Sequence, residues 1–336
     1  MTGQYYFKMH KITLNDLLSR VNLKTPLLRV AQEVTKSYKL GEVEAMDPME
    51  VGYEELNNLL TTSQGKYVVK IFSKHKDKST INSNVTAISN FYEGGIPVPK
   101  LYKNFQGHYL YELETSPGTY LIVMDYFDGQ KFTEIPPTTE DIQNMTKFLA
   151  RIHTLSFPTH TNYDMWLTIN LPQEFTNKKR YLSLDDLALT QRIVDKLARI
   201  DFSQLSKSIV HFDLHRENAM KNKRGKYCIL DLASCDYNYT VFDLGTFIAL
   251  FCLDPINNPS ASRLIYKSVI ETYLKSRSLS KYELSVLPTI IKATYASNLL
   301  IPTFLQKTNQ DENPQQTIYY QSLGQKGLQI LQSKKI

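Results

Sequence analysis

The sequence predicts an α+β protein of two lobes, the first with an antiparallel sheet and one inserted helix and the second mostly helical. Three observations support this fold class. The chain has 336 residues, more than a single hydrophobic core usually serves. Strand-like patterns prevail up to residue 127, and helical periodicity prevails after it. We therefore expect an N-terminal lobe at residues 1–127, with a helical extension at residues 1–42, and a C-terminal lobe at residues 128–336.

The first lobe is expected to open with a helix and three antiparallel strands. Because proline suits the first helical position, the helix is predicted to begin at Thr25-Pro26 and to end near Lys39, before Gly41. Residues 63–65 predict a hairpin turn between the second and third strands. The three strands are predicted at residues 43–51, 56–62 and 66–72.

One inserted helix and further strands complete the predicted sheet. Val85, Ile88 and Phe91 recur at helical spacing, which predicts a helix over residues 79–92. Gly94-Gly95 is expected to end this helix, because glycine adopts the backbone conformation that closes a helix. The remaining strands are predicted at residues 101–104, 108–113 and 120–127.

The second lobe is predicted to consist mainly of helices. Thr138, with Asp141 three residues later, predicts a capped helix that carries apolar residues at helical spacing. Pro288 is expected to kink or divide the last of the long helices. Residues 308–316 are expected to form an exposed loop. Helical periodicity also extends over residues 184–200, 263–274 and 281–300.

Composition excludes several classes of protein. An apolar fraction of 42% is ordinary for a globular protein and excludes general disorder. The longest uncharged apolar run, between Asp243 and Asp254, is too short to span a membrane, and the start of the chain lacks the pattern of a signal peptide. Three cysteines without patterned spacing indicate free thiols in a reducing compartment. We therefore expect a cytoplasmic protein that has no membrane partner.

The net charge of +6 is concentrated near the end of the chain. Residues 255–336 hold ten Lys and Arg residues against four acids. These lysines are scattered among apolar residues, which favours a solvated helix face, and we expect no nucleic-acid partner. Binding of nucleic acid is the alternative, and it predicts an affinity that falls steeply with salt.

The segment with the most chemical content is His211-Phe212-Asp213-Leu214-His215-Arg216-Glu217-Asn218. It supplies an acid and an amide, and a second acid follows at Asp231 after an apolar run typical of a strand. Phosphoryl transfer from ATP requires this set. Asp213 is the candidate base that accepts the proton of a substrate hydroxyl. Asn218 and Asp231 are candidate ligands of Mg²⁺, which prefers oxygen donors.

Lys70 is the candidate cation for the phosphates of ATP. It lies in the strand predicted at residues 66–72, and strand alternation is expected to point it outward. Taken alone, Lys70 is more often a solvent-facing lysine, and Asp231 is as readily the cap of a strand. Their occurrence together with the segment around Asp213 favours the catalytic interpretation.

Zinc binding by His211 and His215 is a competing interpretation. Histidines four residues apart share one face of a helix and can bind zinc. Phe212 stands where the zinc metalloprotease motif requires glutamate, and the preceding residues resemble a strand, so the zinc site is disfavoured. His153, in an apolar helical segment, is interpreted as a packed residue rather than a ligand or a base.

These motifs together resemble the aminoglycoside phosphotransferase and choline kinase family. The resemblance rests on His211-x-Asp213-Leu214-His215-x-x-Asn218, Ile229-Leu230-Asp231 and Phe242-Asp243-Leu244-Gly245, and it spans about residues 43–255. It implies a bilobal protein-kinase-like fold, ATP and Mg²⁺ as cofactors, and a small-molecule alcohol as substrate. The first lobe would bind the nucleotide, and the second lobe would carry the catalytic and substrate-binding residues.

Site residues are implied by the same resemblance. Asp213 corresponds to the catalytic base, and Lys70 corresponds to the residue that contacts the α- and β-phosphates. The metal ligands would be Asn218 and Asp231. Met124, with the backbones of Asp125 and Phe127, would border the adenine. Structural support of the site would come from His211 and Asp243.

Three departures from the family pattern bear on activity. Asn84 falls where the family usually has the helix glutamate that pairs with the lysine. Leu232-Ala233 follows Asp231 where the family often has an aromatic residue and an acid, and the region expected to cover the phosphates has only Gly52. We predict an ATP- and Mg²⁺-dependent phosphotransferase that acts on an antibiotic, an amino alcohol, a homoserine-like compound or a sugar. A catalytically impaired kinase-like protein that binds nucleotide or a partner is the alternative.

Overall fold

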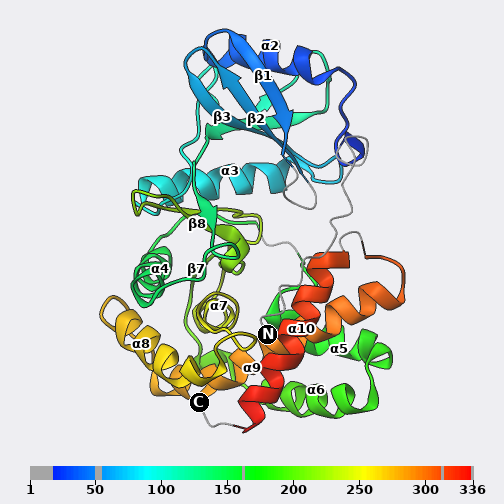
Figure 1. The fold of residues 1–336 in the computed structure, drawn as a ribbon, viewed down its shortest axis with the longest axis vertical. Helices are drawn as coiled ribbons and strands as arrows, with labels where there is room; N and C mark the ends of the chain where they lie inside the picture. The colour runs from blue at the N-terminus through cyan, green and yellow to red at the C-terminus, as the bar shows by residue number, and fades with distance from the viewer. Residues whose placement is uncertain (1–17, 50–54, 161–162, 312–313, 334–336) are drawn as a thin grey trace, which may run out of the picture. The chain divides into compact units, whose positions relative to one another are not determined.

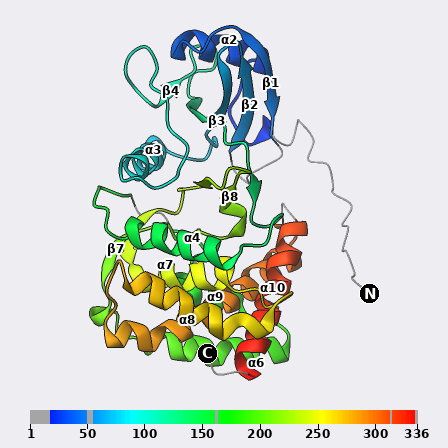
Figure 2. The same ribbon diagram turned by 60° about the vertical axis from the view of Figure 1, so that its left-hand side comes forward.

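The computed structural model describes residues 18–49, 55–160, 163–311 and 314–333. Two compact units are present. The first comprises residues 1–129, 158–160 and 222–230, and the second comprises residues 130–157, 161–221 and 231–336. Figures 1 and 2 show their helices and strands from two sides. The predicted sheet lies in the first unit, and the long helices predicted after residue 127 lie in the second.

The first unit contains a five-stranded antiparallel sheet with the order β1-β2-β3-β5-β4. Its strands β1, β2 and β3 are labelled in Figure 1. Its helix α3 (Lys78–Glu93) is inserted between β3 and β4, as predicted. A short strand that also belongs to this unit, β9 (Tyr227–Ile229), donates the Ile229 N–H to the Pro97 carbonyl at 2.6 Å. The sheet strands are β1 (Val43–Pro48), β2 (Leu56–Thr62), β3 (Gly65–Ile71), β4 (Tyr111–Glu112) and β5 (Tyr120–Asp125).

Helix α2 (Leu27–Tyr38) covers one face of this sheet. Its residues Val30 and Val34 are fully buried against a cluster that includes Leu60, Val69 and Val123 from three neighbouring strands. Side chains alternate between the faces of a strand, so Lys70, next to Val69, points to the opposite face. The sheet therefore uses one face for the core beneath α2 and presents Lys70 on the other.

The second unit is built mainly from helices. Two small antiparallel pairs accompany them, β6 (Gln130–Lys131) with β8 (Ala219–Lys221) and β7 (Lys207–Val210) with β10 (Asp236–Tyr239). A single turn of π-helix, Ile248–Cys252, directly follows α7. The α-helices are α4 (Thr139–Ile152), α5 (Leu171–Lys178), α6 (Leu184–Leu197), α7 (Thr240–Phe247), α8 (Ser262–Leu274), α9 (Lys281–Lys307) and α10 (Pro314–Ser333).

The C-terminal helix α10 packs closely against α9 through two glycines (Figure 1). A Cβ atom on Gly324 would lie 2.6 Å from the Tyr295 carbonyl oxygen, and a Cβ atom on Gly327 would lie 2.5 Å from the Tyr295 ring. Both distances are shorter than a real Cβ contact allows. Glycine at these two positions therefore permits the close approach of the two helices.

Several predicted elements differ from the structure. Pro288 does not divide α9, because the fully buried side chains of Leu287, Ile290 and Ile291 hold the helix together against the cost of a proline, about 3 kcal/mol. The strand predicted at residues 101–104 is reduced to one bridge between Leu101 and Met124. The loop predicted to extend to residue 316 is shorter, since α10 already begins at Pro314.

Helix α9 is long and apolar enough to cross a membrane by length and composition. In the structure, however, 72% of its apolar stretch is buried within the protein. Its buried residues include Tyr295 and the aliphatic side chains that surround Pro288. Such burial is the pattern of a core helix.

Candidate active site

The loop that follows β7 carries the candidate base, and its backbone is held by Asp243 of α7. The Asp243 carboxylate accepts the N–H groups of His211 at 2.7 Å and of Phe212 at 2.9 Å. Phe212 has a positive φ of 64°, which is unfavourable for a bulky side chain. Because the carboxylate is fully buried, these two hydrogen bonds fix the loop in a conformation that it would not adopt alone.

Asp213 projects from this loop with both carboxylate oxygens engaged. Oδ2 accepts a hydrogen bond from Asn218 Nδ2 at 2.7 Å, and Oδ1 lies 3.1 Å from His215 Nε2. The side chain is nevertheless 38% exposed. A carboxylate that is oriented from two sides and still open to solvent has the geometry of a group that can receive a proton from a bound molecule.

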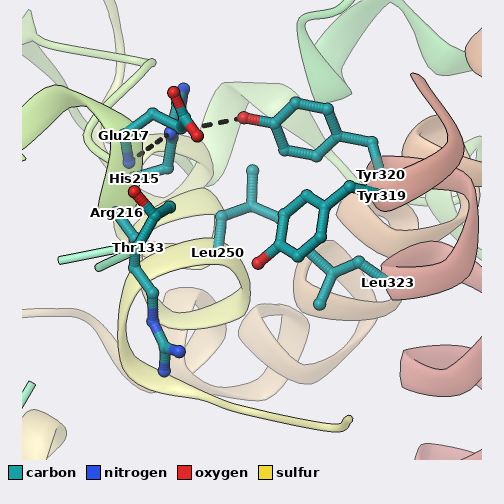
Figure 3. A pocket seen from close by; sticks show the side chains of 8 residues that line it. All are labelled: Thr133, His215, Arg216, Glu217, Leu250, Tyr319, Tyr320 and Leu323. Carbon is teal, nitrogen blue, oxygen red and sulfur yellow. Dashed lines mark hydrogen bonds between the residues drawn. The ribbon is translucent and has the colours of Figure 1, made fainter. Parts of the chain in front are cut away.

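The hydrogen bonds of His215 fix its tautomer. Its Nδ1 accepts the N–H of Glu217 at 3.2 Å, so the proton of the neutral ring lies on Nε2, which faces Asp213. The Tyr320 hydroxyl of α10 lies 3.4 Å from the same Nδ1 (Figure 3). Burial lowers the pKa of His215, but the nearby carboxylates, chiefly Asp213, outweigh it and raise the pKa above its usual value. His215 therefore serves as a hydrogen-bond donor to the candidate base.

A small, partly open pocket lies beside this loop (Figure 3). The Arg216 guanidinium is directed away from it, since it pairs with Asp254 at 2.9 Å and donates to the Phe251 and Leu253 carbonyls. The pocket is narrow, and its central space suffices for about one water molecule. Its lining residues are Thr133, His215, Arg216, Glu217, Leu250, Tyr319, Tyr320 and Leu323.

The candidate metal ligands have suitable donor atoms. Asn218 uses its amide nitrogen for Asp213, so none of these bonds involves its amide oxygen. Asp231 is exposed at a positive φ of 55°, and its carboxylate is close enough to influence the pKa values of His211 and His215. Within the described residues, no cluster of three or more His, Cys, Asp or Glu side chains could hold a metal alone. One amide and one carboxylate suit Mg²⁺, which commonly takes its other ligands from water and phosphate.

The two histidines of the zinc interpretation do not lie on a helix. His211 follows β7 directly, and His215 precedes a single 3-10 turn. His211 Nδ1 accepts the N–H of Asp213 at 3.2 Å, so this ring nitrogen supports the loop backbone. The spacing of four residues therefore does not place both rings on one helix face.

His153 supports the loop indirectly, through its contact with Asp243. Its Nε2 lies 3.0 Å from an Asp243 oxygen, and its Nδ1 lies 2.7 Å from the Tyr273 hydroxyl. The Arg277 guanidinium donates to the His153 carbonyl. His153 is 1% exposed, in agreement with its interpretation as a packed residue.

We expect the folded state to lose stability in mild acid because the lowered pKa values of His153 and His211 outweigh the raised pKa of His215, which acts in the opposite direction. Burial lowers the pKa of His153 and of His211 below the ordinary 6.5. A group whose pKa is lower in the folded state binds its proton more readily when unfolded, so stability is complete above about pH 6.5 and decreases below it. Urea unfolding should show a lower midpoint near pH 5.5 than near pH 7.5, a range above most carboxylate titrations. Equal midpoints would contradict this expectation.

Lys70, in the first unit, lies on the face of the sheet opposite the core beneath α2, yet it is buried there. Its side chain is 10% exposed because the second half of β3 is buried on both faces, so Lys70 is not a solvent-facing lysine. Its amine lies 3.7 Å from a Glu55 carboxylate oxygen. This carboxylate was not predicted from the sequence, although Glu55 stands just two residues before Asn57, the strand partner of Lys70.

The residues implied for the adenine lie at the end of β5. Met124 is half-buried and pairs with Val68 of β3. The Asp125 N–H donates to the Lys100 carbonyl at 3.0 Å, and its carboxylate accepts the Tyr102 hydroxyl at 2.6 Å. Phe127 follows in an irregular segment. These residues belong to the same unit as Lys70, whereas Asp213, Asn218, Asp231, His211 and Asp243 belong to the other.

Known proteins resemble this chain in sequence. A family model described as "Phosphotransferase enzyme family" matches residues 47–274. The chain is 22% identical over 266 residues to a homoserine kinase of Methylobacillus glycogenes, covering 78% of this chain and 80% of that protein. It is 24% identical over 268 residues to a homoserine kinase of Hyphomonas neptunium, with coverage of 75% and 79%.

Solved structures establish the fold. An amicoumacin kinase in complex with AMP-PNP, Ca²⁺ and Ami superimposes with a TM-score of 0.67 at 15% identity, covering 94% of this chain and 96% of that one. The choline kinase LicA from Streptococcus pneumoniae gives a TM-score of 0.57 at 16% identity, with coverage of 90% and 99%. These likenesses confirm the predicted α+β, protein-kinase-like fold class.

Proposed function

Since the chain belongs to the phosphotransferase enzyme family, we propose that it transfers the γ-phosphate of ATP to a hydroxyl group of a small molecule. The observation that carries this proposal is the geometry of Asp213. Its carboxylate is oriented by His215 and Asn218 on a braced loop and remains open to solvent. Phosphoryl transfer depends mainly on positioning and electrostatics, and this loop supplies positioning.

Asp213 would orient the acceptor hydroxyl and receive its proton as the acceptor oxygen bonds to the γ-phosphorus and the bond from that phosphorus to the departing ADP breaks. The Nε2–H of His215 and the amide of Asn218 hold the carboxylate in one orientation while this happens. Asn218 and Asp231 would hold Mg²⁺, which when bound neutralises negative charge on the phosphates. Lys70 would contact the α- and β-phosphates, and Met124 with the backbones of Asp125 and Phe127 would border the adenine.

The acceptor we propose is a small alcohol of the homoserine or amino-alcohol kind. The two relatives named above are homoserine kinases, and one structural neighbour with a TM-score of 0.65 is an aminopropanol kinase. The basic surplus after residue 254 opposes a polycationic aminoglycoside, whose site needs carboxylates. The three cysteines are free and buried, which suits a reducing cytoplasm as the place of action.

A coupled assay of ADP release tests the proposal. The full chain would be incubated with ATP and Mg²⁺ over a panel of homoserine, choline, ethanolamine, aminopropanol, aminoglycosides and sugars. We expect acceptor-dependent ADP release that stops when EDTA removes the metal and returns when Mg²⁺ is restored. Nucleotide binding without a phosphorylated product from any acceptor would instead support the alternative of a catalytically impaired protein that only binds nucleotide. Asn84, in place of the usual helix glutamate, suggested that alternative.

A further inference from the structure

The ion pair of Lys70 lies within the sheet itself. Asn57 of β2 is the direct cross-strand partner of Lys70 on β3. Glu55, two residues earlier, therefore projects from the same face as Lys70, in the diagonal position from which long side chains reach each other. The Lys70 amine also lies 6.0 Å from the centre of the Phe72 ring. The ion-pair partner of the lysine thus comes from the segment that leads into β2.

Glu55 is a buried carboxylate shared by two lysines. Its side chain is 8% exposed, and it contacts both Lys70, at 3.7 Å, and Lys76, which is 17% exposed. The cluster of two ammonium groups and one carboxylate keeps one net positive charge. Without the carboxylate, the two ammonium groups would repel each other at low exposure, and Lys70 would lose its defined position.

Helix α3 offers no carboxylate for this purpose at the expected position. Asn84 is buried on α3, and its amide oxygen has no hydrogen-bond partner among the described residues. Within the same part of the chain, Glu55 is the only carboxylate in ion-pair distance of Lys70. No counter-ion for Lys70 was predicted from the sequence. In the structure Glu55, which directly precedes the neighbouring strand β2, is its counter-ion.

We propose that Glu55 is the positioning residue for Lys70, replacing from the sheet the helix glutamate that Asn84 lacks. The proposal rests on the function proposed above, in which Lys70 contacts the phosphates of ATP. Because both members of the pair belong to one hairpin, their pairing does not depend on where α3 lies. A carboxylate on a helix would make the position of the lysine depend on that helix.

The test measures turnover with saturating ATP, Mg²⁺ and the best acceptor of the panel. Glu55→Gln is expected to lower kcat roughly tenfold to a hundredfold, with the KM for the acceptor unchanged within about twofold. The double variant Glu55→Gln/Lys76→Gln keeps the net charge of the cluster and avoids two unpaired buried ammonium groups. The double variant should show the same loss of kcat as Glu55→Gln, because both variants lack the carboxylate that positions Lys70 and the double variant keeps the net charge. Glu44→Gln, an exposed carboxylate on β1, is the matched control.

A double-mutant cycle separates positioning from general stability. If Glu55 acts through Lys70, then Glu55→Gln adds no further loss of kcat in a Lys70→Met background. Additive losses would overturn the proposal, as would a Glu55→Gln enzyme that keeps its kcat within about twofold of the unmodified chain. An unmodified chain that phosphorylates no acceptor would overturn the proposed function and this inference together. Activity in the unmodified chain with an unaffected Glu55→Gln variant would overturn this inference alone.

Discussion

Replacing Asp213 with asparagine is expected to lower kcat by a factor of about 10² to 10⁴. Asparagine has nearly the same shape, and its amide oxygen can still accept the Nε2–H of His215. It cannot take up the proton of an alcohol, and its amide group opposes the Asn218 amide that now donates to Asp213 at 2.7 Å. The affinity for ADP should change little, since the proposed nucleotide contacts come from other residues.

Steady-state kinetics with titration of ADP binding checks this expectation. Asp185→Asn provides a control, because Asp185 is an exposed carboxylate in the first turn of α6. The control should keep the kcat of the unmodified chain and the same unfolding midpoint. An Asp213→Asn enzyme with full turnover would refute the assignment of the base.

Replacing Asp243 with alanine is expected to destabilise the fold by about 3–5 kcal/mol. The carboxylate accepts two backbone N–H groups and lies 3.0 Å from His153 Nε2, all at 0% exposure of its own side chain. Alanine would leave these donors buried without a partner. The unfavourable backbone of Phe212 would then relax, so turnover should also fall in the molecules that remain folded.

Urea unfolding and kinetics on the same preparation separate the two effects of Asp243→Ala. Asp243→Asn keeps one acceptor oxygen and should lose less stability than alanine, because one backbone N–H can still be satisfied. The Asp185→Asn control should unfold like the unmodified chain. Unchanged unfolding of Asp243→Ala would contradict the bracing role.

Local patterns allowed most elements of the fold to be predicted. The helix capped by Thr138 and Asp141 and the hairpin turn after Thr62 were predicted because their signals lie within a few residues of one another. The missed helix α5 begins with Leu171-Pro172 and spans 8 residues, too few for a clear period. Packing against the core, which no local pattern reveals, keeps α9 continuous through Pro288.

In the candidate site too, contacts between residues close in the sequence were predicted and contacts between distant residues were not. Asp213 and Asn218 stand five residues apart, so their contact follows from a short loop that the motif already indicated. That Asp243 supports this loop was predicted only from the resemblance to a family. Glu55 was not predicted because it precedes the first residue of β2 and meets Lys70 diagonally, outside the paired residues of the hairpin. Tyr320 carried no signal, since it reaches His215 across 105 residues from a helix that was not predicted.

The close packing of Gly324 and Gly327 against Tyr295 has a consequence for how the chain is made. These glycines seat the helix that brings Tyr320 to the ring of His215. Translation runs from the N-terminus, so the segment that carries Tyr320 leaves the ribosome after the loop that carries His215. A nascent chain whose loop around Asp213 has already emerged therefore still lacks Tyr320 and, with it, one wall of the pocket beside that loop.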